Sequence, residues 1–115
     1  MYQSAYNEIA ESGAASTRSR EKEALGRSLD LLRQAREIGF RSHRGAEAIY
    51  TTNRVWSFLI EDLSLSDNEL PDEVRANLIS IGIHVLKRLS DLRGGETAAA
   101  DDIIDITEII QGGLS

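Results

Sequence analysis

Apolar side chains recur three and four residues apart along almost the whole chain, the spacing that places them on one face of an α-helix. No convincing stretch alternates with the period of two that a strand needs, and the single proline and the few aromatic residues also argue against a sheet. The sequence therefore predicts an all-α protein, a compact bundle of four main helices plus a short N-terminal helix. The first main helix is expected to end near residue 38, and the other three are expected to cover about 42–63, 71–93 and 97–110.

The opening helix is short because its apolar face is soon interrupted. Tyr2, Tyr6 and Ile9 are spaced to share one face, and Gly13 with the small residues 14–17 then breaks the pattern. The second helix is expected to start after this break.

Residues with capping chemistry mark the other helix ends. Gly39 suits a left-handed C-cap, and the Ser42 hydroxyl can accept a hydrogen bond from the first turn of the third helix. Pro71 is expected to be the first helical residue of the fourth helix, where its missing N–H costs nothing. The glycine pairs at 94–95 and 112–113 are expected to stop the fourth and the last helix.

The two bulky aromatic residues of the third helix cannot face the same way. Ile49, Trp56, Ile60 and Leu63 fall on one narrow stripe, so Trp56 is expected in the core. Phe58 lies on the opposite side of the helix. It either packs against the N-terminal segment or is presented to a partner.

The fourth helix has more apolar surface than one partner helix would cover. A second stripe of Ile79, Ile83 and Leu86 runs beside the main one, so a hydrophobic groove for a partner's amphipathic helix is expected there. The tyrosines of the opening helix either close this groove or simply dock the N-terminus on the bundle. The candidate partner-binding residues are Tyr2, Tyr6, Trp56, Phe58, Ile79, Ile83 and Leu86.

Length and composition narrow the class of protein. A chain of 115 residues, 41% of them hydrophobic, fits one domain spanning 1–115. It has no cysteine, which excludes a disulfide scaffold, and its apolar runs are far shorter than a membrane-spanning helix needs. Since the N-terminus also lacks the features of a secretory signal, a soluble cytoplasmic protein is expected.

The formal charge of −6 is unevenly distributed. Residues 18–54 carry a local charge of +4, mostly from arginine, whereas residues 61–115 carry −8. Arginine can engage phosphate in a bidentate way, so RNA binding is a minority interpretation, against a charge-laced outer face. The arginines concerned are Arg18, Arg20, Arg27, Arg41 and Arg44.

The chain shows no pattern typical of catalysis or of a bound cofactor. Asp101, Asp105 and Glu108 share a face of the last helix, but no Glu-x-x-His element faces them, so a solvated acidic face is the favoured reading. No serine lies in a nucleophile elbow, and no glycine-rich loop joins a strand to a helix. We therefore expect no enzymatic activity, no metal, no cofactor and no small-molecule substrate.

Four segments resemble those of a known family. They are Met1-Tyr2-x-x-x-Tyr6-x-Glu8-Ile9, the run Val55-Trp56-Ser57-Phe58-Leu59-Ile60-Glu61-Asp62-Leu63, Leu70-Pro71-x-x-Val74-Arg75-Ala76-x-Leu78-Ile79-Ser80-Ile81-Gly82, and Ile103-Ile104-Asp105-Ile106 through Gly112-Gly113-Leu114. In this order, over essentially the whole chain, they resemble the flagellar biosynthesis regulator FlaF family of alphaproteobacteria.

The resemblance implies a non-enzymatic cytoplasmic factor that promotes flagellin synthesis and secretion. Proteins of this family are understood to bind flagellin as export chaperones and to oppose the translational repressor FlbT. Because the terminal segments of flagellin are amphipathic helices, a hydrophobic groove would suit them. The alternative is a post-transcriptional regulator that acts on flagellin mRNA, either directly or through FlbT.

Overall fold

The computed structural model describes the backbone of residues 2–65 and 67–113, and the side chains of residues 19–65 and 67–113. These residues form four helices and no strand, which confirms the all-α prediction. The helices are α1 (Tyr2–Ile38), α2 (His43–Ser64), α3 (Asp72–Arg93) and α4 (Ala99–Gly113).

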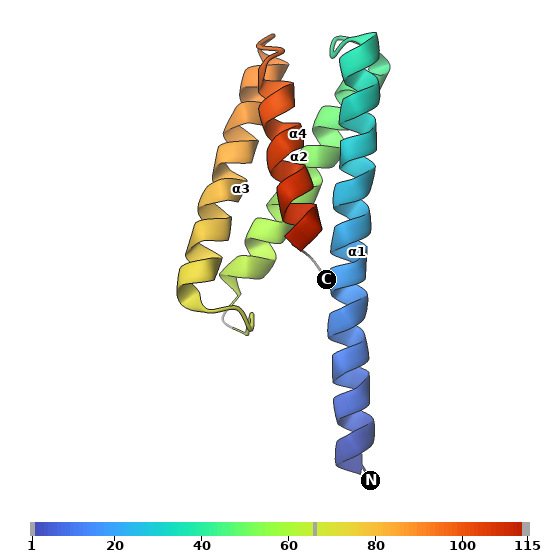
Figure 1. Cartoon of the computed structure of the whole chain (residues 1–115), viewed down its shortest axis with the longest axis vertical. Helices are drawn as coiled ribbons and strands as arrows, with labels where there is room; N and C mark the ends of the chain where they lie inside the picture. Colours follow the sequence, from blue (N-terminus) through green and yellow to red (C-terminus); the bar gives the residue numbers. More distant parts are fainter. Residues whose placement is uncertain (1, 66, 114–115) are drawn as a thin grey trace.

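The four helices form an up-down-up-down bundle, in which each helix runs antiparallel to the one before it (Figure 1). Each packs on its neighbours in sequence, and α4 also packs on α1, which closes the bundle. Short connections between consecutive helices favour this antiparallel arrangement. Among the described residues, no helix combines the length and the apolar character needed to cross a membrane.

The structure corrects the expected break in the N-terminal region. α1 is a single helix of 37 residues, so the separate opening helix and the interruption at Gly13 are wrong. The small residues 14–17 include alanine, the best helix former, and one glycine costs a helix only about 1 kcal/mol. At 1.5 Å per residue such a helix is about 56 Å long, which matches the longest dimension of the molecule, 56 Å. The side chains of Tyr2 and Tyr6 lie outside those described.

The predicted caps are confirmed in the first half of the chain, and the later ends differ by a few residues. Gly39 has a φ of 114°, and the Ser42 hydroxyl accepts a hydrogen bond of 3.1 Å from the Gly45 amide. Pro71 is the N-cap of α3 rather than its first residue. α4 starts two residues later than expected and runs through the glycine pair 112–113, because the cost of a glycine in a helix, about 1 kcal/mol, does not by itself end the helix.

The core lies along the axis of the bundle and receives side chains from all four helices. Leu25, Leu29 and Leu32 of α1 are buried, and so is Trp56 of α2. Towards the end of α2 the predicted stripe becomes less buried, since Ile60 and Leu63 are only half covered. The fully buried large side chains include Leu25, Leu29, Leu32, Val85, Leu89 and Ile103.

Candidate protein-binding site

Trp56 lies in the core and is 2% exposed, as the helical period predicts. Its Nε1–H reaches across the bundle to the Thr107 hydroxyl at 3.4 Å, and that hydroxyl donates to the Ile103 carbonyl oxygen at 2.7 Å. The indole therefore joins α2 to α4 through the interior. Of the two aromatic candidates of this helix, Trp56 is not available at the surface.

A glycine brings α2 and α3 together beside this tryptophan. A Cβ placed on Gly82 would lie 2.7 Å from Ile60 Cγ1 and 3.5 Å from Trp56 Cε3. The distance to Trp56 is an ordinary contact, but the distance to Ile60 is shorter than a Cβ tolerates, so an alanine here would force Ile60 or the helices to shift. The α2 side of α3 is consequently closed.

The predicted second stripe of α3 does not form one continuous exposed surface. Ile83 is 57% exposed, Ile79 is half-buried, and Leu86 packs against the core. The broad apolar arc of α3 is thus covered in part by the bundle itself. Of this stripe, only Ile83 is largely exposed.

A groove of about 320 Å³ opens between α3 and α4, on a different face from this stripe. Its most exposed apolar residue is Ile109, which is 72% exposed and is absent from the predicted candidates. The pattern could have revealed it, since Ile109 lies three residues after Ile106 and therefore next to it on the helix. The groove is lined by Ser80, Ile81, His84, Ile106, Ile109 and Ile110.

The isoleucines make this groove an almost wholly apolar site. Ile106 and Ile110 are half-buried and packed against the core, so their positions are fixed by the bundle. Ile109 projects beyond them. A groove with such lining can accept an aliphatic side chain of a partner helix, since burial of one such side chain contributes about 1.5–3 kcal/mol.

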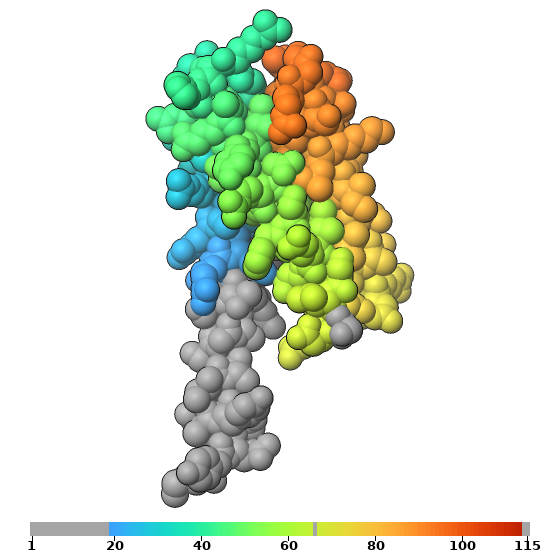
Figure 2. Space-filling view, turned by 180° about the vertical axis from the view of Figure 1, so that it is seen from behind, coloured from blue at the N-terminus to red at the C-terminus, as the bar shows by residue number. Residues whose placement is uncertain are grey.

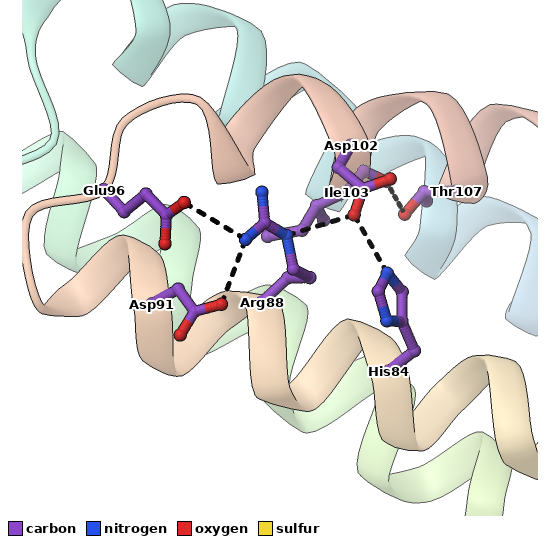
Figure 3. A network of polar contacts seen from close by, with 7 residues as sticks. All are labelled: His84, Arg88, Asp91, Glu96, Asp102, Ile103 and Thr107. Atoms are coloured by element: carbon purple, nitrogen blue, oxygen red, sulfur yellow. Dashed lines mark hydrogen bonds and ion pairs between the residues drawn. The ribbon is translucent and has the colours of Figure 1, made fainter.

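A network of polar contacts holds α3 and α4 together next to the groove (Figure 3). Asp102 Oδ2 accepts hydrogen bonds from His84 Nε2 at 2.9 Å and from Arg88 Nε at 3.1 Å. A guanidinium nitrogen of Arg88 also lies 3.0 Å from Asp91 Oδ2 and 3.5 Å from Glu96 Oε1. Burial opposes the charge of Arg88, but these carboxylates outweigh it and raise the pKa of its guanidinium above the usual value. The network fixes the spacing of the two helices that line the groove.

The acidic residues Asp101, Asp105 and Glu108 of α4 are all exposed, as the sequence predicts, and two of them also pair with arginines of α1. Arg33 donates a hydrogen bond to Glu108, and Arg36 donates one of 2.8 Å to Asp101. Two positive side chains of α1 thus meet the acidic half of the chain at the α1–α4 seam. In the described part of the chain, no three acidic or histidine side chains converge as metal ligands.

The arginines proposed for RNA binding differ in their surroundings. Arg27 and Arg41 are exposed, Arg44 lies 3.6 Å from Glu47, and Arg20 has an interaction partner. The side chain of Arg18 lies outside those described. Two further arginines of this positively charged region, Arg33 and Arg36, pair with carboxylates of α4.

Phe58 is 59% exposed, so the side chain opposite the core stripe of α2 is presented at the surface. It borders a second groove, of about 210 Å³, between α1 and α2. This groove does not include the residues of the α3–α4 groove. Ile83 lines neither groove, so the predicted candidates Phe58 and Ile83 are not brought together in one groove.

The fold and these surfaces define an all-helical bundle with apolar grooves between its helices. The chain matches the family model described as flagellar protein FlaF over residues 2–114. It therefore belongs to the FlaF family, as its segments suggested. Comparison with curated proteins finds no match, and comparison with solved structures finds none either.

Proposed function

We propose that this chain is a non-enzymatic flagellar biosynthesis factor that binds flagellin in the α3–α4 groove and promotes its synthesis and secretion as an export chaperone. Membership of a flagellar protein family supports the process. The single observation that supports a binding role is the exposed isoleucine-lined groove, whose most exposed side chain is Ile109.

The groove suits one kind of client, a segment that folds as an amphipathic helix. Its lining is aliphatic, and Ile109 is ready to lose its exposed surface to a partner. Half-buried Ile106 and Ile110 offer a fixed floor, so little conformational entropy is lost there on binding. The terminal helices of flagellin, disordered before assembly, are clients of this kind.

The test is a titration of the purified protein with monomeric flagellin at low and moderate salt. Burial of apolar surface responds little to salt, so we expect the affinity to survive. Ile109→Ser should weaken binding by roughly tenfold or more, because it removes an aliphatic contact worth at least about 1.4 kcal/mol.

A matched control is available on α1. Ile38 is 65% exposed and lines neither groove, so Ile38→Ser makes the same chemical change elsewhere and should leave the affinity unchanged. Equal losses in both variants would contradict the groove assignment. Absence of flagellin binding, together with tight and salt-sensitive binding of flagellin mRNA, would favour the translational regulator instead.

A further inference from the structure

A line of large side chains runs along the exposed side of α2. Tyr50, Arg54 and Phe58 are four residues apart, so they lie on successive turns of the same helix face. Tyr50 is 61% exposed and Arg54 is exposed as well. Seen from behind, α2 lies in the middle of the molecular surface, between α1 and the α3–α4 pair (Figure 2). This face of α2 is therefore accessible to a partner.

Arg54 differs in its contacts from the arginines that join one helix to another. Arg33, Arg36 and Arg88 each pair with a carboxylate of another element. Within the described residues no carboxylate pairs with Arg54, whose guanidinium donates a hydrogen bond of 3.1 Å to the Tyr50 hydroxyl and lies 5.9 Å from the centre of that ring. The hydrogen bond to Tyr50 raises the pKa of Arg54 above its usual value. The guanidinium is thus oriented by a neutral tyrosine rather than by a carboxylate.

The groove beside Arg54 has an apolar floor. It is formed by Ala24 of α1 and by Val55, Phe58 and Leu59 of α2, with Arg54 at its border. Aromatic residues and arginine are the side chains most enriched among those that dominate binding energies at protein interfaces. An apolar hollow beside one fixed cation calls for a ligand with an apolar group and an anion close to it.

We propose that the α1–α2 groove is a second docking surface, which binds a helix of a partner protein by seating an aliphatic side chain in the hollow and pairing a carboxylate one helical turn away with Arg54. A carboxylate of the partner would form a charge-assisted hydrogen bond with Arg54, which pairs with no carboxylate among the described residues. An aliphatic anchor fits a floor of Val55, Leu59 and Phe58. This inference does not depend on flagellin, since it concerns the face of the bundle away from the α3–α4 groove.

A protein helix fits this surface better than a nucleic acid does. The carboxylate-bearing side chain of Glu21 lines the groove, and the exposed Glu47 and Glu61 lie one turn beyond Tyr50 and Phe58. A nucleic acid carries a negative charge on every nucleotide and would meet these acids along the line, whereas a protein helix can place a single carboxylate at Arg54 alone. The aliphatic floor also lacks donors and acceptors that would read a base edge.

The probes are two synthetic peptides of about 18 residues with the same leucine positions, long enough to form a helix on binding. One carries glutamate beside the leucine stripe and the other carries lysine at the same positions. Titration of the isotope-labelled full chain, followed by NMR, gives both the affinity and the residues whose signals shift. The glutamate peptide is expected to bind roughly tenfold more tightly than the lysine peptide, with shifts at Ala24 and along residues 50–59.

Two variants distinguish the contribution of the Arg54 charge to peptide affinity from the contribution of the apolar groove. Arg54→Gln should bring the affinities of the two peptides together, whereas Phe58→Ala should weaken both peptides equally. Arg93→Gln, a matched change of an exposed arginine at the end of α3, should leave the preference intact. Circular dichroism checks that each variant remains helical.

Three outcomes would overturn the proposal. These are equal binding of the two peptides by the unmodified chain, shifts confined to the α3–α4 groove, and tighter binding of a short single-stranded oligouridine than of either peptide. None of them bears on flagellin binding, which is measured with flagellin itself.

Discussion

The two flanks of α3 meet their neighbours in different ways. Towards α2, Gly82 allows Ile60 and Trp56 to approach so closely that a Cβ would clash with Ile60. Towards α4, Ile81 and Ile106 border an open groove of about 320 Å³. The flank towards α2 is closed because Gly82 has no side chain. The flank towards α4 stays open between bulky isoleucines.

The difference shows how one helix can serve both stability and binding. Close packing at Gly82 maximises dispersion contacts around a buried tryptophan, where removal of any group leaves a cavity. On the other flank Ile109 remains exposed, so the bundle gains little from it. An apolar side chain that contributes little to the fold is free to contribute to a complex.

The largest effect is expected at the closed flank. Trp56→Ala should lower the free energy of unfolding by about 3–5 kcal/mol, because it removes a buried aromatic side chain and its contact with Thr107. Chemical denaturation measures the loss. A change below 1 kcal/mol would mean that the indole is not held in the core.

A smaller loss is expected when the glycine contact is filled. Gly82→Ala should lower the stability by roughly 1–2 kcal/mol, since overpacking against Ile60 outweighs the better helix propensity of alanine. Gly26→Ala is the matched control in α1, where the added Cβ would meet only the amide end of the flexible Gln111 side chain, whose exposed hydrogen bond to the Lys22 carbonyl oxygen can be replaced by water. The control should be neutral or stabilising by up to about 1 kcal/mol. Equal effects of the two changes would contradict the close approach of α2 and α3.

On the open flank, the polar network is expected to carry a modest share of the stability. Asp102→Ala removes the acceptor shared by His84 and Arg88 and should cost about 1 kcal/mol, because the carboxylate is partly exposed and screened by solvent. Asp105→Ala, at an exposed position on the same helix, should change the stability by less than about 0.5 kcal/mol. A larger loss from Asp105 than from Asp102 would show that α4 is held to α3 by other contacts.

The smallest effect on folding is expected at the most exposed isoleucine. Ile109→Ser should change the free energy of unfolding by less than about 0.5 kcal/mol, as for other surface substitutions. Thermal and chemical melts check this value. A loss of several kcal/mol would place Ile109 in the core and would end the distinction between the two flanks.

Local chemistry explains why much of the fold could be predicted from the sequence. The C-cap at Gly39 and the N-cap at Ser42 depend on one or two residues, and the burial of Trp56 follows from its helical period. The break expected at Gly13 is wrong because the weak preference of one glycine is easily outweighed by its helix-forming neighbours.

The surface was harder to predict because it depends on which helices become neighbours. The pairing of Arg33 with Glu108 joins residues from opposite ends of the chain, and no local pattern shows it. Likewise, Ile109 borders a groove only because α4 packs beside α3, and Tyr50 matters only because Arg54 turns towards it. The sequence shows that the helices have more apolar side chains than the core can bury. The packing of the helices decides which of these side chains are exposed.

The central claim is that the isoleucine-lined α3–α4 groove is where flagellin binds. The most direct measurement is NMR of the isoleucine methyl groups in the full chain, followed during a titration with monomeric flagellin. We expect large chemical-shift changes for the methyl groups of Ile81, Ile106, Ile109 and Ile110, which line the groove. The signal of Ile38 should remain unchanged. Binding of flagellin that leaves the four groove signals in place would contradict it.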